Sequence, residues 1–175
     1  MKCCGPCIKT IPEGDDKPRL TCADCGYIDY QNPKPTAHSV AIYDDKILLV
    51  RRAIEPRTGF WCLPGGHQEK GEPLKTTAIR EAFEEAAAVI APDELLAVYE
   101  VPAANITLTI YRARLLHPYI APGNESQEVR LFDWQDIPWA DLAFPMVANA
   151  LHFYKKTQDR TDFAPDQQVL ARPAP

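Results

Sequence analysis

Three glutamates stand close together in the stretch REAFEEAAA, at positions 81, 84 and 85. On a helix they would crowd one side, where like charges repel. A solvated helix face usually gains from Lys or Arg four residues after Glu, whereas Glu81 is followed by Glu85 and Glu84 by Ala88. Hard divalent cations such as Mg²⁺ and Mn²⁺ bind carboxylate oxygens and would offset the repulsion. From the acids alone, a metal site and a plain solvated surface are both open.

The segment that carries these acids, residues 73–90, is the strongest predicted helix of the chain. Pro73 suits its first position. A rotation of about 100° per residue places a set of apolar residues almost opposite the acids. This predicted core side consists of Ile79, Ala82, Phe83 and Ala86.

A glycine-containing loop, WCLPGGHQEKGEP, leads into this helix. Gly65, Gly66 and Gly71 allow positive φ angles and let the backbone approach a ligand closely. A tight loop followed by a carboxylate-bearing helix is suited to holding a metal that is bound to a diphosphate. The sequence therefore predicts a ligand-binding function for Gly65 and Gly66.

The other periodic segments mix strands and helices without a regular βαβ repeat. Residues 39–53 are predicted as a β-hairpin, because two runs of Val, Ile and Leu flank an Asp-Asp turn. The remaining predicted elements are a strand at 106–116, a strand followed by a turn at 128–138, and a second helix at 145–156. This order predicts an α/β fold with a mixed sheet flanked by helices.

Five of the six cysteines lie in the first 25 residues, which indicates metal binding more than a disulfide framework. Cys4, Cys7, Cys22 and Cys25 form two Cys-x2-Cys pairs, the arrangement of a zinc ribbon. Four thiolates leave no open position on Zn²⁺, so the zinc would be structural. Cys3 is left over, and a pairing of Cys3 with Cys7 fits less well; four unliganded thiols are the other alternative.

The sequence divides into a zinc ribbon (1–34), a central domain (35–156) and a polar, Pro-rich C-terminal tail (157–175), expected to be loose or to lie on a neighbour. The net charge is −5 without a long basic run, which disfavours nucleic acid as a partner. We find neither a signal peptide nor an apolar run of membrane-spanning length, and we expect a soluble cytoplasmic protein.

The spaced pattern around the acids resembles the signature of the Nudix hydrolases. That signature runs Gly-x5-Glu-x7-Arg-Glu-U-x-Glu-Glu-x-Gly-U, where U is a bulky apolar residue. The matching residues are Gly66, Glu72, Arg80, Glu81, Glu84 and Glu85. The chain departs from the pattern in two ways, because Ala87 replaces the second Gly and the small Ala82 and Ala88 occupy the U positions.

The resemblance implies an α/β/α sandwich and the hydrolysis of a nucleoside diphosphate linked to another group. In that family Mg²⁺ or Mn²⁺ on the helix glutamates activates a water that attacks phosphorus. Glu81 and Glu85 match the usual metal ligands, and Glu84 matches a further ligand or base. Arg80 and Glu72 match an ion pair that orients the ligands.

Many members of the family take one more acid from a later loop, and GNESQEVRLF is the candidate segment. Glu125 lies in the predicted loop and Glu128 at the start of the strand. The sequence does not choose between them, and an acidic turn without a catalytic role is the alternative.

A zinc ribbon followed by a Nudix domain resembles a branch that includes ADP-ribose and FAD diphosphatases. NADH diphosphatases also carry a zinc ribbon, but their SQPWPFPxS stretch has no counterpart here. An aromatic ring would suit the adenosine of either substrate, and Trp61, Tyr99 and Tyr111 flank the expected cleft; core packing is the alternative for each. A non-catalytic nucleotide sensor is the second functional class, and a homodimer is left open.

Overall fold

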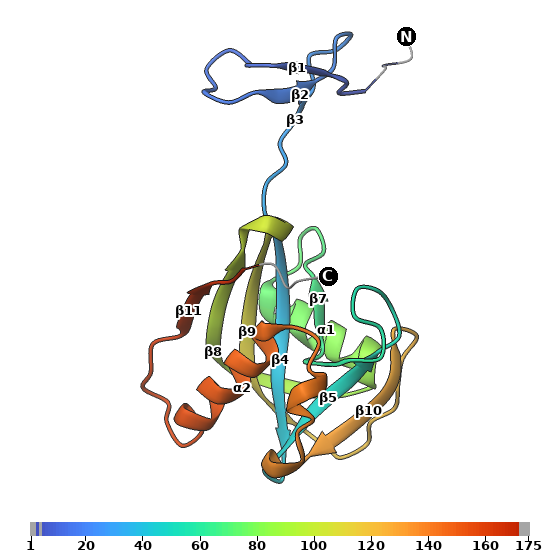
Figure 1. The fold of residues 1–175 in the computed structure, drawn as a ribbon, viewed down its shortest axis with the longest axis vertical. Helices are drawn as coiled ribbons and strands as arrows, with labels where there is room; N and C mark the ends of the chain where they lie inside the picture. Colours follow the sequence, from blue (N-terminus) through green and yellow to red (C-terminus); the bar gives the residue numbers. More distant parts are fainter. Residues whose placement is uncertain (1–2, 4, 172–175) are drawn as a thin grey trace. The chain divides into compact units, whose positions relative to one another are not determined.

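The computed structural model describes Cys3 and residues 5–171. The chain forms two compact units, residues 1–32 and 33–175 (Figure 1). The N-terminal unit contains a three-stranded antiparallel sheet in the order β1-β2-β3. Its strands are β1 (Ile8–Thr10), β2 (Arg19–Thr21) and β3 (Ile28–Asp29).

The second unit is built on an eight-stranded mixed sheet. Six strands follow the order β10-β5-β4-β9-β8-β11, and β6 and β7 pair with β5 and β4. The pairs β4–β9 and β8–β11 are parallel, and the others are antiparallel. The strands are β4 (Lys34–Tyr43), β5 (Lys46–Arg52), β6 (Trp61–Cys62), β7 (Gly65–His67), β8 (Ile90–Val101), β9 (Ile106–Leu115), β10 (Ser126–Phe132) and β11 (Asp166–Val169).

Two α-helices cover the sheet, α1 (Leu74–Ala86) and α2 (Pro145–Thr157). Figure 1 shows them on opposite faces, which confirms the predicted α/β/α sandwich. Three short 3₁₀ helices, η1 (Pro102–Ala104), η2 (Trp134–Asp136) and η3 (Trp139–Asp141), lie in connections. No helix among the described residues is long and apolar enough to cross a membrane. The cytoplasmic location and the homodimer stay predictions.

The β4–β5 hairpin confirms the strongest local prediction. Asp44 and Asp45 have φ angles of 47° and 63°, which two-residue hairpin turns require. The turn sets Tyr43 opposite Lys46. Strand β4 also pairs with β7, which carries Gly65 and Gly66. The hairpin therefore helps to position the glycine loop.

Helix α1 ends four residues earlier than predicted. Ala87 adopts the left-handed conformation (φ 49°, ψ 23°) and stops the helix. The Ala87 N–H donates to the Phe83 carbonyl at 2.9 Å, the bond of a left-handed C-cap, and the Ala88 N–H donates to the Ala82 carbonyl at 3.1 Å. The family's glycine therefore corresponds to a helix-ending position, and β8 begins soon after it.

We expect Ala87→Gly to raise the free energy of unfolding by about 1 kcal/mol, because an L residue in the left-handed region costs roughly 1–2 kcal/mol and glycine loses some of that gain through chain entropy. Urea denaturation measures the change. The matched control is Ala86→Gly, inside the helix, which should lower stability. A less stable Ala87→Gly variant would contradict this account of the cap.

The predicted core side of α1 was wrong in part. Ile79 and Phe83 are 40% and 60% exposed, whereas Ala82 and Ala86 are buried as expected. The other buried residues of the helix are Thr77, Ala78 and Glu85. Small alanines let the helix approach the sheet closely. The side of the helix that faces the sheet therefore includes Glu85, while Ile79 and Phe83 face the solvent.

The C-terminal segment also differs from the expected loose tail. Residues Asp166–Val169 form β11 at the edge of the sheet, parallel to β8. The Tyr99 hydroxyl donates to Asp166 Oδ2 at 2.8 Å, and Asn149 Nδ2 donates to Gln168 Oε1 at 2.8 Å. Tertiary hydrogen bonds thus order a segment that has no apolar pattern of its own.

Candidate metal and diphosphate site

Helix α1 presents its three glutamates in different environments. Glu85 is buried, at 8% exposure, Glu81 is half-buried, and Glu84 is exposed. The three carboxylates therefore lie across the boundary between the protein core and the solvent. The acids do not form the plain solvated surface that the sequence left open.

Arg80 connects most of the acids. Its Nη1 donates to Glu81 Oε1 at 2.8 Å and to Glu84 Oε2 at 2.9 Å. Its Nε and Nη2 donate to the two oxygens of Glu72 at 3.0 and 3.1 Å, and Nη2 also donates to the His67 carbonyl at 3.0 Å. One guanidinium thus holds three carboxylates and the backbone before the helix.

Glu72 is fixed by further contacts at the start of the helix. The Arg80 guanidinium lowers the pKa of Glu72 to about 2, and the Thr77 hydroxyl, which donates to Oε2 at 2.8 Å, contributes. The Glu69 N–H also donates to this carboxylate, at 3.2 Å. Glu72 is therefore ionised, and it forms an ion pair with Arg80, with Nε 3.0 Å from Oε1.

Glu85 is buried next to other charges. Its Oε2 accepts a hydrogen bond from the Gly65 N–H at 3.0 Å. Burial raises the pKa of Glu85 to about 7, and the charges of Glu81 and Glu125 add to the effect; the Gly65 hydrogen bond and the charge of Arg52 oppose it. Burial also raises the pKa of Glu81. Burial therefore opposes the ionisation of both acids.

The two loop glycines are required by close contacts. A Cβ atom on Gly66 would lie 2.5 Å from the Glu81 carboxylate. Gly65 has a φ of 156°, and a Cβ atom there would lie 2.3 Å from the His38 ring. The backbone of the loop therefore lies directly against the Glu81 carboxylate and the His38 ring; ligand binding by Gly65 and Gly66 stays a prediction.

The two candidate acids of the later loop, Glu125 and Glu128, lie in different surroundings. The charge of Glu125 raises the pKa of both Glu81 and Glu85. Glu128 instead lies 3.7 Å from Arg51 Nη1 on the exposed part of β10. The loop that precedes Glu125 is attached to the C-terminal end of α1, because the Gly123 N–H donates to the Glu85 carbonyl at 3.0 Å.

Trp61 is in the core and not in the cleft. It is 8% exposed, and its ring packs edge-on against Phe132 at 4.9 Å. Tyr99 and Tyr111 are also buried. All three aromatics therefore pack in the core, which was the alternative for each. The burial of Trp61 argues against its predicted contact with adenosine.

Two residues near the site were not recognised from the sequence. Arg52, at the end of β5, lies close enough to lower the pKa of Glu85 through its charge. His38 lies beneath Gly65 on β4. A second arginine at a strand end and a lone histidine in a strand are common features, so neither carries a distinctive signal.

The donor set fits a hard divalent cation. Carboxylates are the side chains that Mg²⁺ and Mn²⁺ prefer. Burial raises the pKa of Glu85, and of Glu81 in spite of its ion pair with Arg80, so a bound cation would favour the ionised forms of both acids. No three acids of the described residues bring their oxygens within 4.8 Å of one another, as expected for carboxylates that repel.

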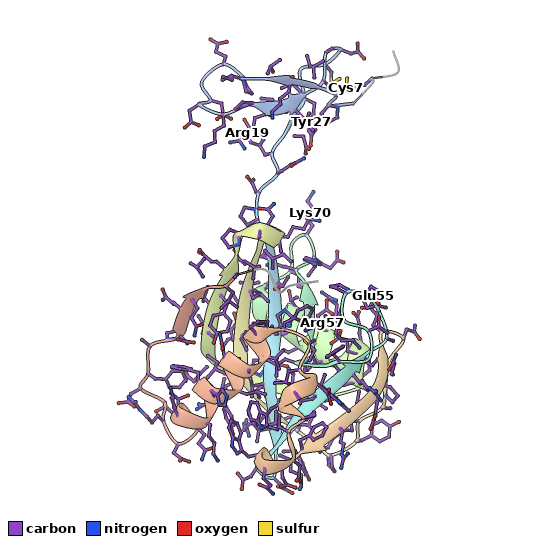
Figure 2. The ribbon with its side chains drawn as sticks, in the orientation of Figure 1. Cys7, Arg19, Tyr27, Glu55, Arg57 and Lys70 are labelled. Atoms are coloured by element: carbon purple, nitrogen blue, oxygen red, sulfur yellow. The ribbon has the colours of Figure 1, made fainter. Side chains whose placement is uncertain are left out.

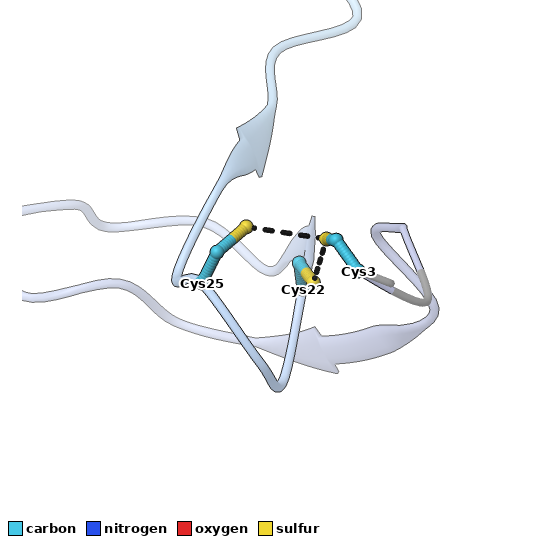
Figure 3. A group of neighbouring side chains, drawn as sticks. All are labelled: Cys3, Cys22 and Cys25. Carbon is cyan, nitrogen blue, oxygen red and sulfur yellow. Dashed lines mark hydrogen bonds between the residues drawn. The ribbon is translucent and has the colours of Figure 1, made fainter. Parts of the chain in front are cut away.

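Three cysteines of the N-terminal unit come together (Figure 3). The sulfur atoms of Cys3, Cys22 and Cys25 lie within 4.8 Å of one another, and Cys3 Sγ is 2.9 Å from Cys22 Sγ. Sharing a proton with Cys3 lowers the pKa of Cys22 to about 6 and raises that of Cys3 to about 11. Such a cluster of thiols, one of them readily ionised, is typical of a metal site.

The structure describes only part of the predicted ligand set. Cys3, which the sequence left over, lies in the cluster, and Cys4 lies outside the described residues. Cys7 is in the same unit (Figure 2) but is not among the three clustered thiols. Cys22 and Cys25 are placed as expected.

We expect Cys22→Ser and Cys25→Ser to release about one zinc per chain and to unfold the N-terminal unit first, because structural zinc contributes folding free energy directly. Elemental analysis and hydrogen exchange measure the two effects. Cys62→Ala is the matched control, since Cys62 is buried in the second unit. Zinc content that is unchanged in the Cys22 variant would contradict the assignment.

Comparison with known proteins agrees with this geometry. A family model described as NUDIX domain matches residues 33–156, and another, described as Nudix N-terminal, matches residues 1–31. The chain belongs to the Nudix family. This confirms the resemblance, the hydrolase class and the zinc-ribbon character of the N-terminal unit.

Individual relatives support the family assignment. A Nudix hydrolase from Nitrosomonas europaea is 40% identical, with a TM-score of 0.89 over 98% of this chain and 100% of that one. An ADP-ribose pyrophosphatase from Methanocaldococcus jannaschii is 29% identical over 66% of this chain and 69% of that protein. An ADP-ribose pyrophosphatase from Streptococcus suis, 22% identical with a TM-score of 0.63 over 79% of this chain and 100% of that one, shares the fold.

Proposed function

We propose that this Nudix hydrolase cleaves the diphosphate bond of ADP-ribose with Mg²⁺ or Mn²⁺ bound at the acids of α1. The observation that carries the proposal is that Glu81 and Glu85 both lie against the glycine loop: the Gly65 N–H donates to Glu85 Oε2 at 3.0 Å, and a Cβ atom on Gly66 would lie 2.5 Å from the Glu81 carboxylate. Such a group of acids is suited to a cation that brings a diphosphate with it.

The residues of the site have separable roles in this proposal. Glu81 and Glu85 hold the metal, which neutralises phosphate charge and activates a water when bound. Arg80 and Glu72 keep the ligand carboxylates in place. Glu84 is exposed and bound to Arg80, so it serves as a further ligand or as the base that accepts a proton from the attacking water.

ADP-ribose ranks first among the substrates because a relative that matches two thirds of the chain is named an ADP-ribose pyrophosphatase. FAD ranks second, on the resemblance to the zinc-ribbon branch, and NADH ranks lower because the SQPWPFPxS stretch is missing. Cleavage of ADP-ribose gives AMP and ribose 5-phosphate, and cleavage of FAD gives AMP and FMN.

A substrate screen tests the proposal. The protein is incubated with ADP-ribose, FAD, NADH, dinucleoside polyphosphates and nucleotide sugars, each with Mg²⁺ and with Mn²⁺, and the products are separated by chromatography. We expect the highest kcat/KM for ADP-ribose. A clear preference for NADH or for nucleoside triphosphates would reject the substrate, and binding of ADP-ribose without hydrolysis would favour a nucleotide sensor.

A further inference from the structure

His38 fills the space beneath the glycine loop. It is 8% exposed on β4 and stands opposite Gly65 of β7 in the register of the two strands. A Cβ atom on Gly65 would lie 2.3 Å from Nδ1 and 2.5 Å from Cγ of His38. The imidazole is therefore in contact with the Gly65 backbone and prevents it from moving inward.

An apolar side chain would fill this space with less difficulty than histidine. Nε2 lies 3.2 Å from Thr36 Oγ1, but Nδ1 is buried without a hydrogen-bond partner among the described residues. Leaving a buried polar atom unpaired is unfavourable. Nδ1 and its neighbour Cγ are the ring atoms that lie against Gly65.

Gly65 connects this ring to the metal-binding acids. Its N–H donates to Glu85 Oε2 at 3.0 Å. That hydrogen bond holds one oxygen of a buried carboxylate and so limits the orientations that the other oxygen takes. The contacts run in order from His38 to Gly65 and from Gly65 to Glu85.

We propose that His38 is a positioning residue, whose ring supports Gly65 so that the Gly65 N–H holds Glu85 in the orientation that binds the divalent metal. The inference rests on the proposed function, because it takes Glu85 as a metal ligand. Substitution of a residue that orients a metal ligand without touching the metal commonly lowers metal affinity by about 10- to 100-fold.

Three variants separate this role from general packing. His38→Ala removes both atoms that lie against Gly65. His38→Asn keeps Cγ and a polar δ atom there, and loses the part of the ring that faces Thr36. Val40→Ala is the matched control, because Val40 is fully buried two residues further along β4, on the same side of the strand.

The readout is the dissociation constant of Mn²⁺, measured on the zinc-containing protein by electron paramagnetic resonance of free Mn²⁺, with thermal unfolding recorded beside it. We expect His38→Ala to weaken Mn²⁺ binding about tenfold or more and His38→Asn to stay within about threefold of the wild type. Val40→Ala should lower the unfolding temperature and bind Mn²⁺ as the wild type does.

Several results would overturn the inference: wild-type Mn²⁺ affinity in folded His38→Ala, equal weakening in the Ala and Asn variants, or equal weakening in Val40→Ala. If His38→Ala does not fold, His38→Ser takes its place; it keeps an atom at the γ position and loses the δ atom, and we expect it to weaken Mn²⁺ binding by more than about threefold. A wild-type protein that binds no Mn²⁺ would reject the proposed metal site itself, and the inference with it.

Discussion

Glu85→Gln is expected to abolish turnover while it makes the metal-free protein more stable. The change keeps the size of the side chain and an oxygen that accepts from Gly65. It removes the charge of a metal ligand, so we expect kcat to fall by about 1,000-fold, since metal charge contributes several kcal/mol to such reactions. Steady-state kinetics with ADP-ribose measures this loss.

The gain in stability follows from the pKa of about 7 that burial gives Glu85 in the folded protein. Between its unfolded pKa near 4.5 and about 7, the folded state binds more protons than the unfolded state, so stability falls as the pH rises. Above pH 7 the full penalty is about 3 kcal/mol. Glu85→Gln should remove it and flatten the pH dependence.

Chemical denaturation of metal-free protein at pH 5 and pH 8 measures this second effect. The wild type should be less stable at pH 8 through Glu85, and the variant should exceed it there by more than at pH 5. Saturating Mg²⁺ should stabilise the wild type and not the variant. A variant with near-normal turnover would contradict the metal assignment, and a variant less stable than the wild type at pH 8 would contradict the burial cost assigned to Glu85.

Arg80→Lys is expected to have the second largest effect. Arginine donates to Glu72, Glu81 and Glu84 from three nitrogens at once, whereas lysine offers one point charge. We expect kcat/KM to fall by about 100-fold although the charge is kept. Kinetics at saturating Mg²⁺ and a Mg²⁺ titration separate the loss of turnover from the loss of metal affinity.

The matched control is Arg51→Lys, because Arg51 pairs with Glu128 at 3.7 Å on the exposed surface and should not affect turnover. Glu72→Gln should be milder than Arg80→Lys, since Glu72 contacts Arg80 while Arg80 itself contacts Glu81 and Glu84. Equal effects of the Arg80 and Arg51 variants would argue against the positioning role of Arg80.

Elements with a local signal were predicted from the sequence, and elements that depend on tertiary contacts were not. The hairpin and α2 were found because apolar periodicity and turn residues agree there. Strand β8 was missed because its register shifts near Pro92 and Leu95 interrupt the alternation. Strand β11 was missed because hydrogen bonds from Tyr99 and Asn149 order it.

The candidate site was predicted to the extent that its residues follow one long spaced pattern. The acids of α1 were identified in this way. Glu125 and Glu128 were not separated, because the β-bulge between Ser126 and Glu128 changes which residues face the site. Trp61 was assigned to the ligand because an aromatic beside a binding loop has the same pattern as an aromatic in the core.

The most direct test of the account is the turnover of ADP-ribose by metal-free protein during a titration with Mg²⁺. The protein is treated with a chelator mild enough to leave the structural zinc, and AMP is measured by chromatography as Mg²⁺ is added. We predict no AMP without added metal and a saturable rise with Mg²⁺ that Glu85→Gln does not show. AMP formation at the full rate without a divalent metal would contradict the account.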